Sequence, residues 1–200
     1  MKHYTVALLT ITFLLLAQSV QAAELATAKV LKVTGDVLKY SSGGGSKTLQ
    51  EGDLIKEGDG ITTSFYSSVD LIFSNGTELT VLENSSLSFE EMAQEPFSGD
   101  LTYDELTADP SQSQTLLQLN YGQVDGHVKK LRKDSNFEVN TPLGTAAIRG
   151  TVFRVAITFD LTTGNISLNI TNFDGLVDLL TPFVEDSDAV EYDLDLTSNN

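Results

Sequence analysis

Residues 140–155, NTPLGTAAIRGTVFRV, carry the pattern that decides the fold. Downstream of Gly150, apolar residues that include Phe153 and Val155 alternate with polar residues that include Arg154. Side chains of a strand alternate between its two faces, so this pattern predicts a half-buried β-strand over residues 151–161. If the strand runs straight back through Gly150, Arg149 lies on the same face as Phe153 and points into the core.

Arg149 is a lone cation among small and apolar residues. A buried guanidinium needs oxygen partners for its N–H groups. The pattern therefore favours an arginine that staples a tight corner by donating to backbone carbonyls, and the alternative is an anion-binding group. Upstream, Pro142 holds Thr141 extended, which places a corner just before the strand.

Short apolar segments continue on both sides of this stretch. They lie at residues 28–40, 49–63, 68–82, 116–128, 137–141 and 165–171, and glycine or asparagine residues separate many of them. Asn75 and Gly76 interrupt residues 68–82, which predicts a hairpin with a type I′ turn or, alternatively, a corner between stacked coils. The pattern as a whole predicts an all-β fold.

Two acidic segments interrupt or follow the strands. Residues 90–113 contain seven acids, no base and two prolines, which predicts a solvated loop insertion with one helical turn near residues 103–106. A calcium site in this insertion is an alternative, but the spacing of the acids matches no EF-hand loop. Residues 183–200 are expected to form an acidic C-terminal tail or edge segment.

The first 22 residues have the pattern of a secretory signal. A short basic start precedes an apolar run, and Val20 and Ala22 supply small residues before the expected cleavage point. An uncleaved membrane anchor is the alternative, but the run is shorter than the roughly 20 apolar residues of a typical span. No later segment is apolar enough to span a membrane, so the cleaved chain is expected to be periplasmic or secreted.

The net charge of the chain is -16, and the sequence contains no cysteine. A strongly acidic chain repels nucleic acid, because binding to nucleic acid depends on neutralising phosphates. Nucleic acid is therefore not expected as a partner. Without disulfides, stability must come from the core.

A basic cluster, residues 126–133 (GHVKKLRK), reverses the sign of the charge locally. One interpretation is a surface that docks an acidic partner, an anionic polysaccharide or a lipid head group. The other is a solvated edge strand whose lysines discourage pairing with other chains. The cluster consists of His127, Lys129, Lys130, Arg132 and Lys133.

The sequence predicts no catalytic, cofactor-binding or metal-binding residues. His127 is the only histidine downstream of the signal, and a zinc site needs more nitrogen or sulfur ligands. No serine or cysteine stands in a recognisable pattern with a base. The alternative that remains is a carbohydrate-active enzyme that uses surface carboxylates, whose separation the sequence does not reveal.

Residues 137–153, FEVNTPLGTAAIRGTVF, resemble the FecR domain family, in which a Phe-x-Val-x-Thr-Pro run leads to Arg-Gly-Thr-x-Phe. The resemblance extends over most of residues 28–180. Its motif residues are Thr141, Pro142, Arg149, Gly150, Thr151 and Phe153.

The resemblance implies a twisted, solenoid-like stack of short strands outside the cytoplasm. In the best-known members this domain is the periplasmic part of a sigma-factor regulator that receives a signal from an outer-membrane iron-siderophore transporter. The cytoplasmic segment and the membrane span of that regulator are not recognised in this sequence. For this chain, the resemblance implies a non-catalytic domain whose partner is an envelope protein or a polysaccharide.

Overall fold

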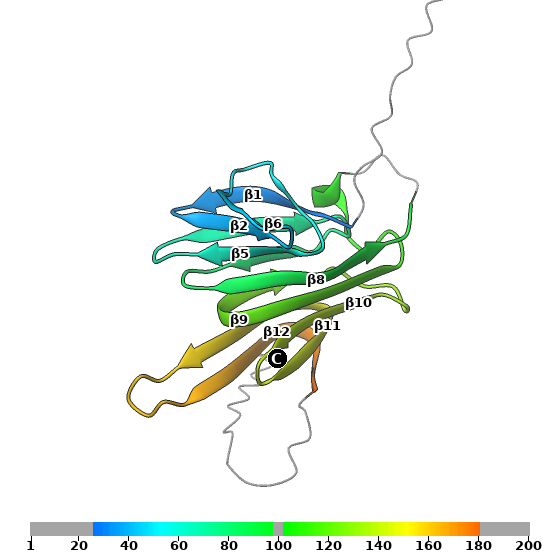
Figure 1. Ribbon diagram of the computed structural model, residues 1–200. Helices are drawn as coiled ribbons and strands as arrows, with labels where there is room; N and C mark the ends of the chain where they lie inside the picture. Colours follow the sequence, from blue (N-terminus) through cyan, green and yellow to red (C-terminus); the bar gives the residue numbers. More distant parts are fainter. Residues whose placement is uncertain (1–25, 98–101, 181–200) are drawn as a thin grey trace, which may run out of the picture.

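Alternating apolar and polar residues form twelve β-strands in the computed structural model, which describes residues 26–97 and 102–180 (Figure 1). The fold is all-β, as predicted, and the short turn η1 (Tyr103–Glu105) is the only helical element among these described residues. The strands are β1 (Ala28–Thr34), β2 (Val37–Ser41), β3 (Ser46–Thr48), β4 (Leu54–Ile55), β5 (Asp59–Thr63), β6 (Ser68–Phe73), β7 (Glu78–Val81), β8 (Ser86–Gln94), β9 (Ser113–His127), β10 (Asn136–Thr141), β11 (Gly144–Phe159) and β12 (Ile166–Leu180). The predicted signal at residues 1–22 and the acidic segment at residues 183–200 lie outside the described residues.

The twelve strands belong to one curled sheet whose two halves share β9. The first part of β9 pairs with β8 and with β10, and its last part pairs with β7 and with β11. β11 and β12 also run through both halves, and they form a long hairpin that extends beyond the rest of the sheet (Figure 1). The chain thus joins the two halves through its longest strands.

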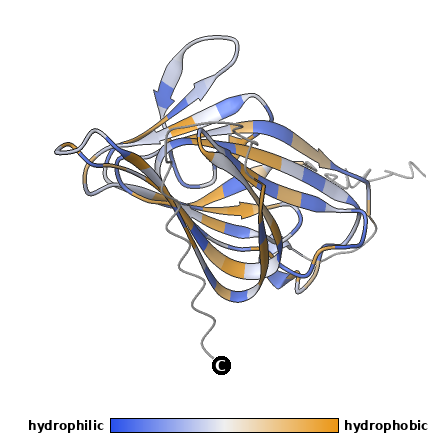
Figure 2. Cartoon of the chain, turned by 90° about the horizontal axis from the view of Figure 1, so that it is seen from below, coloured by the Kyte–Doolittle hydropathy of each residue, from blue (hydrophilic) through white to orange (hydrophobic). Residues whose placement is uncertain are grey.

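The core lies between the two halves of the sheet. Phe73, Phe89, Phe137 and Phe153 are buried and come from β6, β8, β10 and β11. Their rings form a continuous series with centroid distances of 6.2 Å, 5.7 Å and 6.3 Å. Figure 2 shows hydrophobic and hydrophilic residues alternating along the strands, as expected for strands with one face toward this core.

The predicted stack of solenoid-like coils is not confirmed. Neighbouring strands pair antiparallel throughout, except for the parallel pair of β9 and β10. Strands of successive coils would pair parallel. Among the described residues, the pairing therefore shows a curled, largely antiparallel sheet.

The predicted hairpin at residues 68–82 is confirmed, because β6 pairs antiparallel with β7. The type I′ turn is wrong, since a positive φ occurs at Gly76 but not at Asn75. The Gly76 N–H donates to the Phe73 carbonyl at 2.8 Å, which gives a three-residue loop with a glycine bulge. Asn75 is buried, and its side chain accepts from the Thr77 N–H and donates to Ser113.

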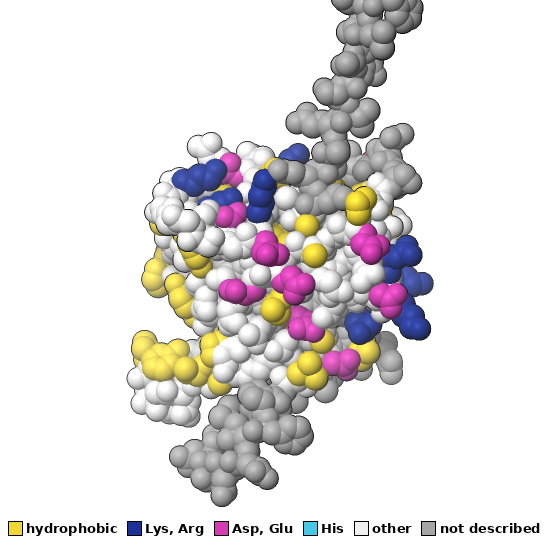
Figure 3. Space-filling model, turned by 45° about the vertical axis from the view of Figure 1, so that its right-hand side comes forward, with side chains coloured by type: hydrophobic (Ala, Val, Ile, Leu, Met, Phe, Trp, Pro, Cys, Tyr) yellow, Lys and Arg dark blue, Asp and Glu magenta, His cyan; other side chains and the backbone are white. Residues whose placement is uncertain are grey.

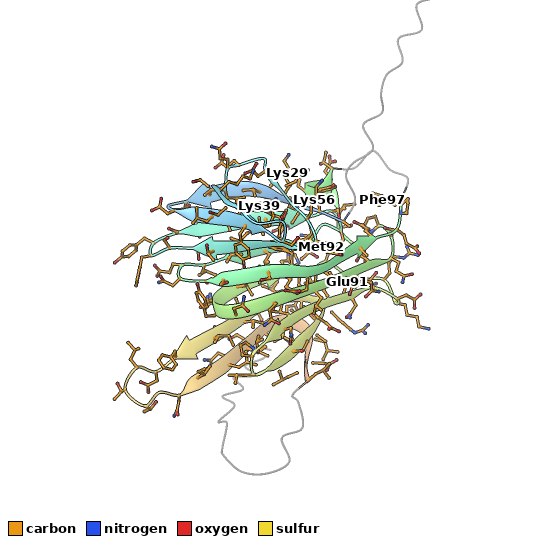
Figure 4. All side chains as sticks on the ribbon, viewed as in Figure 1. Lys29, Lys39, Lys56, Glu91, Met92 and Phe97 are labelled. Carbon is orange, nitrogen blue, oxygen red and sulfur yellow. The ribbon has the colours of Figure 1, made fainter. Side chains whose placement is uncertain are left out.

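The acidic loop predicted at residues 90–113 is wrong over its first five residues, which belong to β8. The register of β8 against β9 shifts between Phe89 and Glu91, so that Glu90 and Glu91 are both exposed while Met92 is buried. Glu91 and Met92 are labelled in Figure 4. This bulge breaks the alternation from which a strand is recognised. The predicted helical turn is confirmed as η1.

No helix within residues 26–97 and 102–180 is long and apolar enough to cross a membrane.

Candidate functional site

The Arg-Gly-Thr motif forms a bulge in β11. Gly150 has a φ of +57°, and the register of β11 against β12 shifts immediately after Arg149. The bulge reverses the alternation, so Ile148 is buried and Arg149 is exposed. The predicted buried staple is therefore wrong. The Arg149 guanidinium makes no hydrogen bond or ion pair with any described residue, and an anion-binding role for it stays a prediction.

A second bulge in β12 fits against the first. Gly175 has a φ of +92°, and a Cβ atom at this position would lie 2.5 Å from the Gly150 carbonyl oxygen. Thr151 is buried, and its hydroxyl donates to Asn172 Oδ1 at 2.6 Å. Asn172 Nδ2 in turn donates to the Gly175 carbonyl at 2.9 Å. These contacts define the double bulge: Gly150 and Thr151 of β11 against Asn172 and Gly175 of β12.

Phe153 returns the chain to the core after the double bulge. Its ring is buried beside Phe137, and a Cβ atom at Gly126 would lie 2.4 Å from it. Gly126 pairs with Phe153 across β9 and β11, so the missing side chain of Gly126 leaves the space that the ring fills.

The Thr-Pro part of the motif forms the turn between β10 and β11. The Thr141 hydroxyl donates to the Gly144 carbonyl at 2.7 Å and accepts from the amides of Leu143 and Gly144. Pro142 is exposed at the corner. Five of the six motif residues thus form the bulge, the turn or the core. The Arg149 side chain is exposed and has no partner among the described residues.

On the solvent face beside the double bulge lies a shallow hollow of about 250 Å³, which we call the outer groove. Four strands contribute its side chains: β7, β9, β11 and β12. The bulge brings Val152 and Phe173 to its rim, and both are exposed, with 54% of Phe173 accessible. The side chains around the groove are those of Glu78, Thr80, Asp125, His127, Val152, Arg154 and Phe173.

One ion pair joins two side chains that line the outer groove, Arg154 and Asp125, and a second joins the groove residue Glu78 to Lys129. Arg154 donates to both oxygens of Asp125, from Nε at 2.8 Å and from Nη2 at 2.6 Å, and these hydrogen bonds raise the pKa of Arg154 above its ordinary value. Lys129 Nζ lies 2.9 Å from Glu78 Oε1 and 3.3 Å from His127 Nδ1. The planar, bidentate Arg154–Asp125 pair fixes both side chains more firmly than a single contact would.

The Arg154–Asp125 pair belongs to a row of polar side chains that runs across six strands. Thr80 lies opposite Asp125 and donates to Asp70 Oδ1 at 2.8 Å. Directly opposed side chains of this kind stabilise neighbouring strands and hold the face in one shape. The row consists of Lys32, Asp70, Thr80, Asp125, Arg154 and Thr171.

The structure divides the predicted basic cluster. His127 lines the outer groove, and Lys129 reaches the groove residue Glu78 from the loop between β9 and β10, in which Lys130, Arg132 and Lys133 also lie. The edge-strand interpretation is wrong, because the last residues of β9 pair with β7 on one side and β11 on the other.

The loop is held against other parts of the chain. The Lys130 carbonyl accepts from the Asp109 amide at 3.0 Å, and a Cβ atom at Gly150 would lie 3.4 Å from Lys130 Cα. Arg132 lines a separate hollow with acidic neighbours that include Asp134. Figure 3 shows Lys and Arg side chains in two groups, at the upper left and at the right of the view, and Asp and Glu side chains lie next to both groups. Docking of an anionic partner by the loop stays a prediction.

In the described parts of the chain, no three side chains of His, Cys, Asp or Glu come together as a metal site would require.

A family model described as FecR protein matches residues 59–171, more than half of the chain. The chain belongs to the FecR family. The FecR match runs from β5 into β12 and includes the β11 bulge and most of the outer groove. FecR domains are typical of the periplasmic part of signalling proteins, and the family is regulatory. A search of curated proteins and a search of solved structures each found no match.

Sequence reasoning placed Arg154 on the solvent face but missed its partner. Asp125 lies 29 residues earlier in the chain, and only the register of β11 against β9 brings the two together. Phe173 was missed because it follows the last predicted strand. The available signal was an aromatic residue between polar residues and just before a glycine, in the sequence Asn-Phe-Asp-Gly.

Proposed function

We propose that this FecR-family chain is exported and acts as a non-catalytic binding protein. Its partner is a protein or a cell-envelope polymer in the periplasm or outside the cell, and the proposal includes a role in signalling. The observation that carries it is that the matched FecR region supplies most of the outer groove, where the exposed side chains of Val152 and Phe173 lie beside ion pairs. Phe173 lies two residues beyond the end of the match. Aromatic anchors with a polar surround are typical of binding surfaces.

Export is supported by residues 1–22, whose basic start, apolar run and small residues before position 22 have the pattern of a secretory signal. The FecR match supports the same compartment, since FecR domains are typical of periplasmic segments.

The charges of the outer groove favour binding over a carbohydrate-active enzyme. Hydrolysis of a glycosidic bond uses two carboxyl groups, one to donate a proton and one to attack or to activate water. The two carboxylates at this groove, Glu78 and Asp125, are each held by a cation. Arg154 contacts both oxygens of Asp125, and Lys129 contacts one oxygen of Glu78, so these pairs fix the shape of the surface.

The test compares two serine substitutions in the β11–β12 hairpin. Phe173→Ser removes the aromatic ring at the groove, and Leu161→Ser is the control, because Leu161 is 89% exposed at the other end of the hairpin and does not line the groove. Thermal melts are recorded with the protein fraction and with the polysaccharide fraction of the cell envelope.

The proposal expects one fraction to raise the melting temperature of the wild type and of Leu161→Ser but not of Phe173→Ser. Stabilisation of all three proteins to the same extent would contradict the proposed site. Absence of an effect from both fractions on the wild type would contradict the binding function.

A further inference from the structure

β12 is an edge strand along its whole length, since its only partner among the described strands is β11. Beyond the double bulge, residues 176–180 have two different faces. Val177 and Leu179 pack against the core but are only partly buried. Leu176 and Leu180 face solvent and are 53% and 57% exposed. The margin of the core is therefore incompletely covered at this edge.

The charge of the edge has one sign. Residues 160–180 contain no Lys, Arg or His. Asp174 and Asp178 are exposed, and neither carboxylate makes an ion pair or hydrogen bond within residues 26–97 and 102–180. Natural proteins commonly protect an edge with charged residues, most often lysine, with proline or with a bulge. Residues 176–180 contain one charged residue, Asp178, and no lysine or proline, and the bulge of β12 lies before them at Gly175.

We propose that the edge of β12 at residues 176–180 accepts a strand from a protein partner in which apolar side chains alternate with Lys or Arg. The inference rests on the proposed binding function and specifies the chemistry of the partner. The free main-chain groups of β12 would pair with the added strand. Its apolar side chains would lie beside Val177 and Leu179, and its cations beside Asp174 and Asp178, since side chains on adjacent strands interact directly.

Charge complementarity favours this occupant over two others. A second copy of the chain would bring a net charge of -16 against an acidic edge. The chain's own residues 183–200 contain six acids and no base, so they would place carboxylates beside Asp174 and Asp178. Like charges on paired strands are destabilising.

The probe is a synthetic peptide of about seven alternating Val and Lys residues, blocked at both ends, a length that spans this edge. The control peptide has Glu in place of Lys. Binding to the full chain is measured by fluorescence anisotropy, and the site is located by amide hydrogen exchange. The Lys peptide is expected to bind and to slow exchange at residues 176–180, and the Glu peptide is expected not to bind.

Matched charge variants test the acidic edge. The double substitution Asp174→Asn and Asp178→Asn removes both carboxylates and should weaken binding of the Lys peptide by about tenfold, as expected for two exposed charge contacts. Glu90→Gln with Glu91→Gln is the control, because it removes the same charge from exposed positions on β8. The control variant should bind as tightly as the wild type.

Three results would overturn the inference. The first is equal binding by the two double variants, or protection located outside residues 176–180. The second is slow exchange at residues 176–180 in the free protein, which would mean that the edge is already covered. If light scattering then shows a dimer, a second copy covers the edge, and otherwise the chain itself covers it. The third is no binding of the Lys peptide. If Phe173→Ser still abolishes stabilisation by an envelope fraction, the proposed function stands while this inference fails.

Discussion

Gly175→Ala tests whether the double bulge requires glycine for both conformation and space. Gly175 has a φ of +92°, a region that residues with a Cβ atom rarely adopt. The added methyl group would lie 2.5 Å from the Gly150 carbonyl oxygen and 2.8 Å from Thr151 Cβ. Neither atom belongs to a flexible side-chain end, so β11 and β12 must move apart.

The expected loss of stability has two parts. Backbone strain at a disfavoured φ costs about 1–3 kcal/mol. Separation of the strands also weakens the 2.6 Å hydrogen bond between Thr151 and Asn172, which adds about 1 kcal/mol. The total of about 2–4 kcal/mol corresponds to a fall in melting temperature of about 5–15 °C for a domain of this size.

The assay is a thermal melt and a urea titration of the wild type, Gly175→Ala and the control Gly164→Ala. Gly164 lies in the turn of the same hairpin with a φ of +77°, but a methyl group added there would have no neighbouring atom within 4 Å. The control therefore reports the backbone strain alone, about 1–3 kcal/mol, and Gly175→Ala should be less stable than this control by about 1 kcal/mol. Equal stability of the two variants would refute the close approach of the two bulges.

Three further predictions concern Arg149, Thr151 and the buried carboxylate of Asp59 in β5. Arg149→Ala should change the free energy of unfolding by less than about 0.5 kcal/mol, because the side chain is exposed and unpaired among the described residues. A loss of several kcal/mol in a urea titration would instead support the predicted arginine that staples the corner. Thr151→Val removes the 2.6 Å hydrogen bond donated to β12 and should cost about 1 kcal/mol in the same assay, whereas unchanged stability would show that the bond contributes nothing. Burial by itself raises the pKa of Asp59, but hydrogen bonds from Lys39 and Ser41 outweigh burial and lower this pKa below its ordinary value of 3.8. A pKa that falls on folding gives stability that is complete above the unfolded value and is lost at lower pH. The difference in urea midpoint between the wild type and Asp59→Asn should therefore shrink between about pH 5 and about pH 3. A constant difference would contradict the assignment.

The sequence predicted those features that depend on local alternation. Phe153, Val155 and Ile157 are buried as their spacing indicates, because a regular strand carries its side chains to alternate faces. Arg149 was placed on the wrong face because one glycine at positive φ reverses that alternation. Glu90 and Glu91 look like the start of an acidic loop for the same reason, since a bulge exposes two consecutive residues of β8.

The outer groove depends on strand register, which local patterns do not contain. Glu78 and Lys129 are separated by 51 residues, and the sheet brings them within 2.9 Å. The family motif alone does not show where the groove lies. The double bulge brings Val152 and Phe173 to the rim of the groove, and the sequence does not reveal this bulge. Most of the motif residues therefore shape the bulge and the turn beside the outer groove, which we propose as the binding surface.

The most direct test of the binding function is site-specific photo-crosslinking in the cell that makes the protein. A photoreactive amino acid is placed at position 173, in the outer groove, or at position 161, in the hairpin turn outside it. The proposed function predicts a discrete adduct with one partner from position 173 and none from position 161. The absence of an adduct at position 173, or the same adduct from both positions, would contradict the claim that the FecR domain binds its partner through the outer groove.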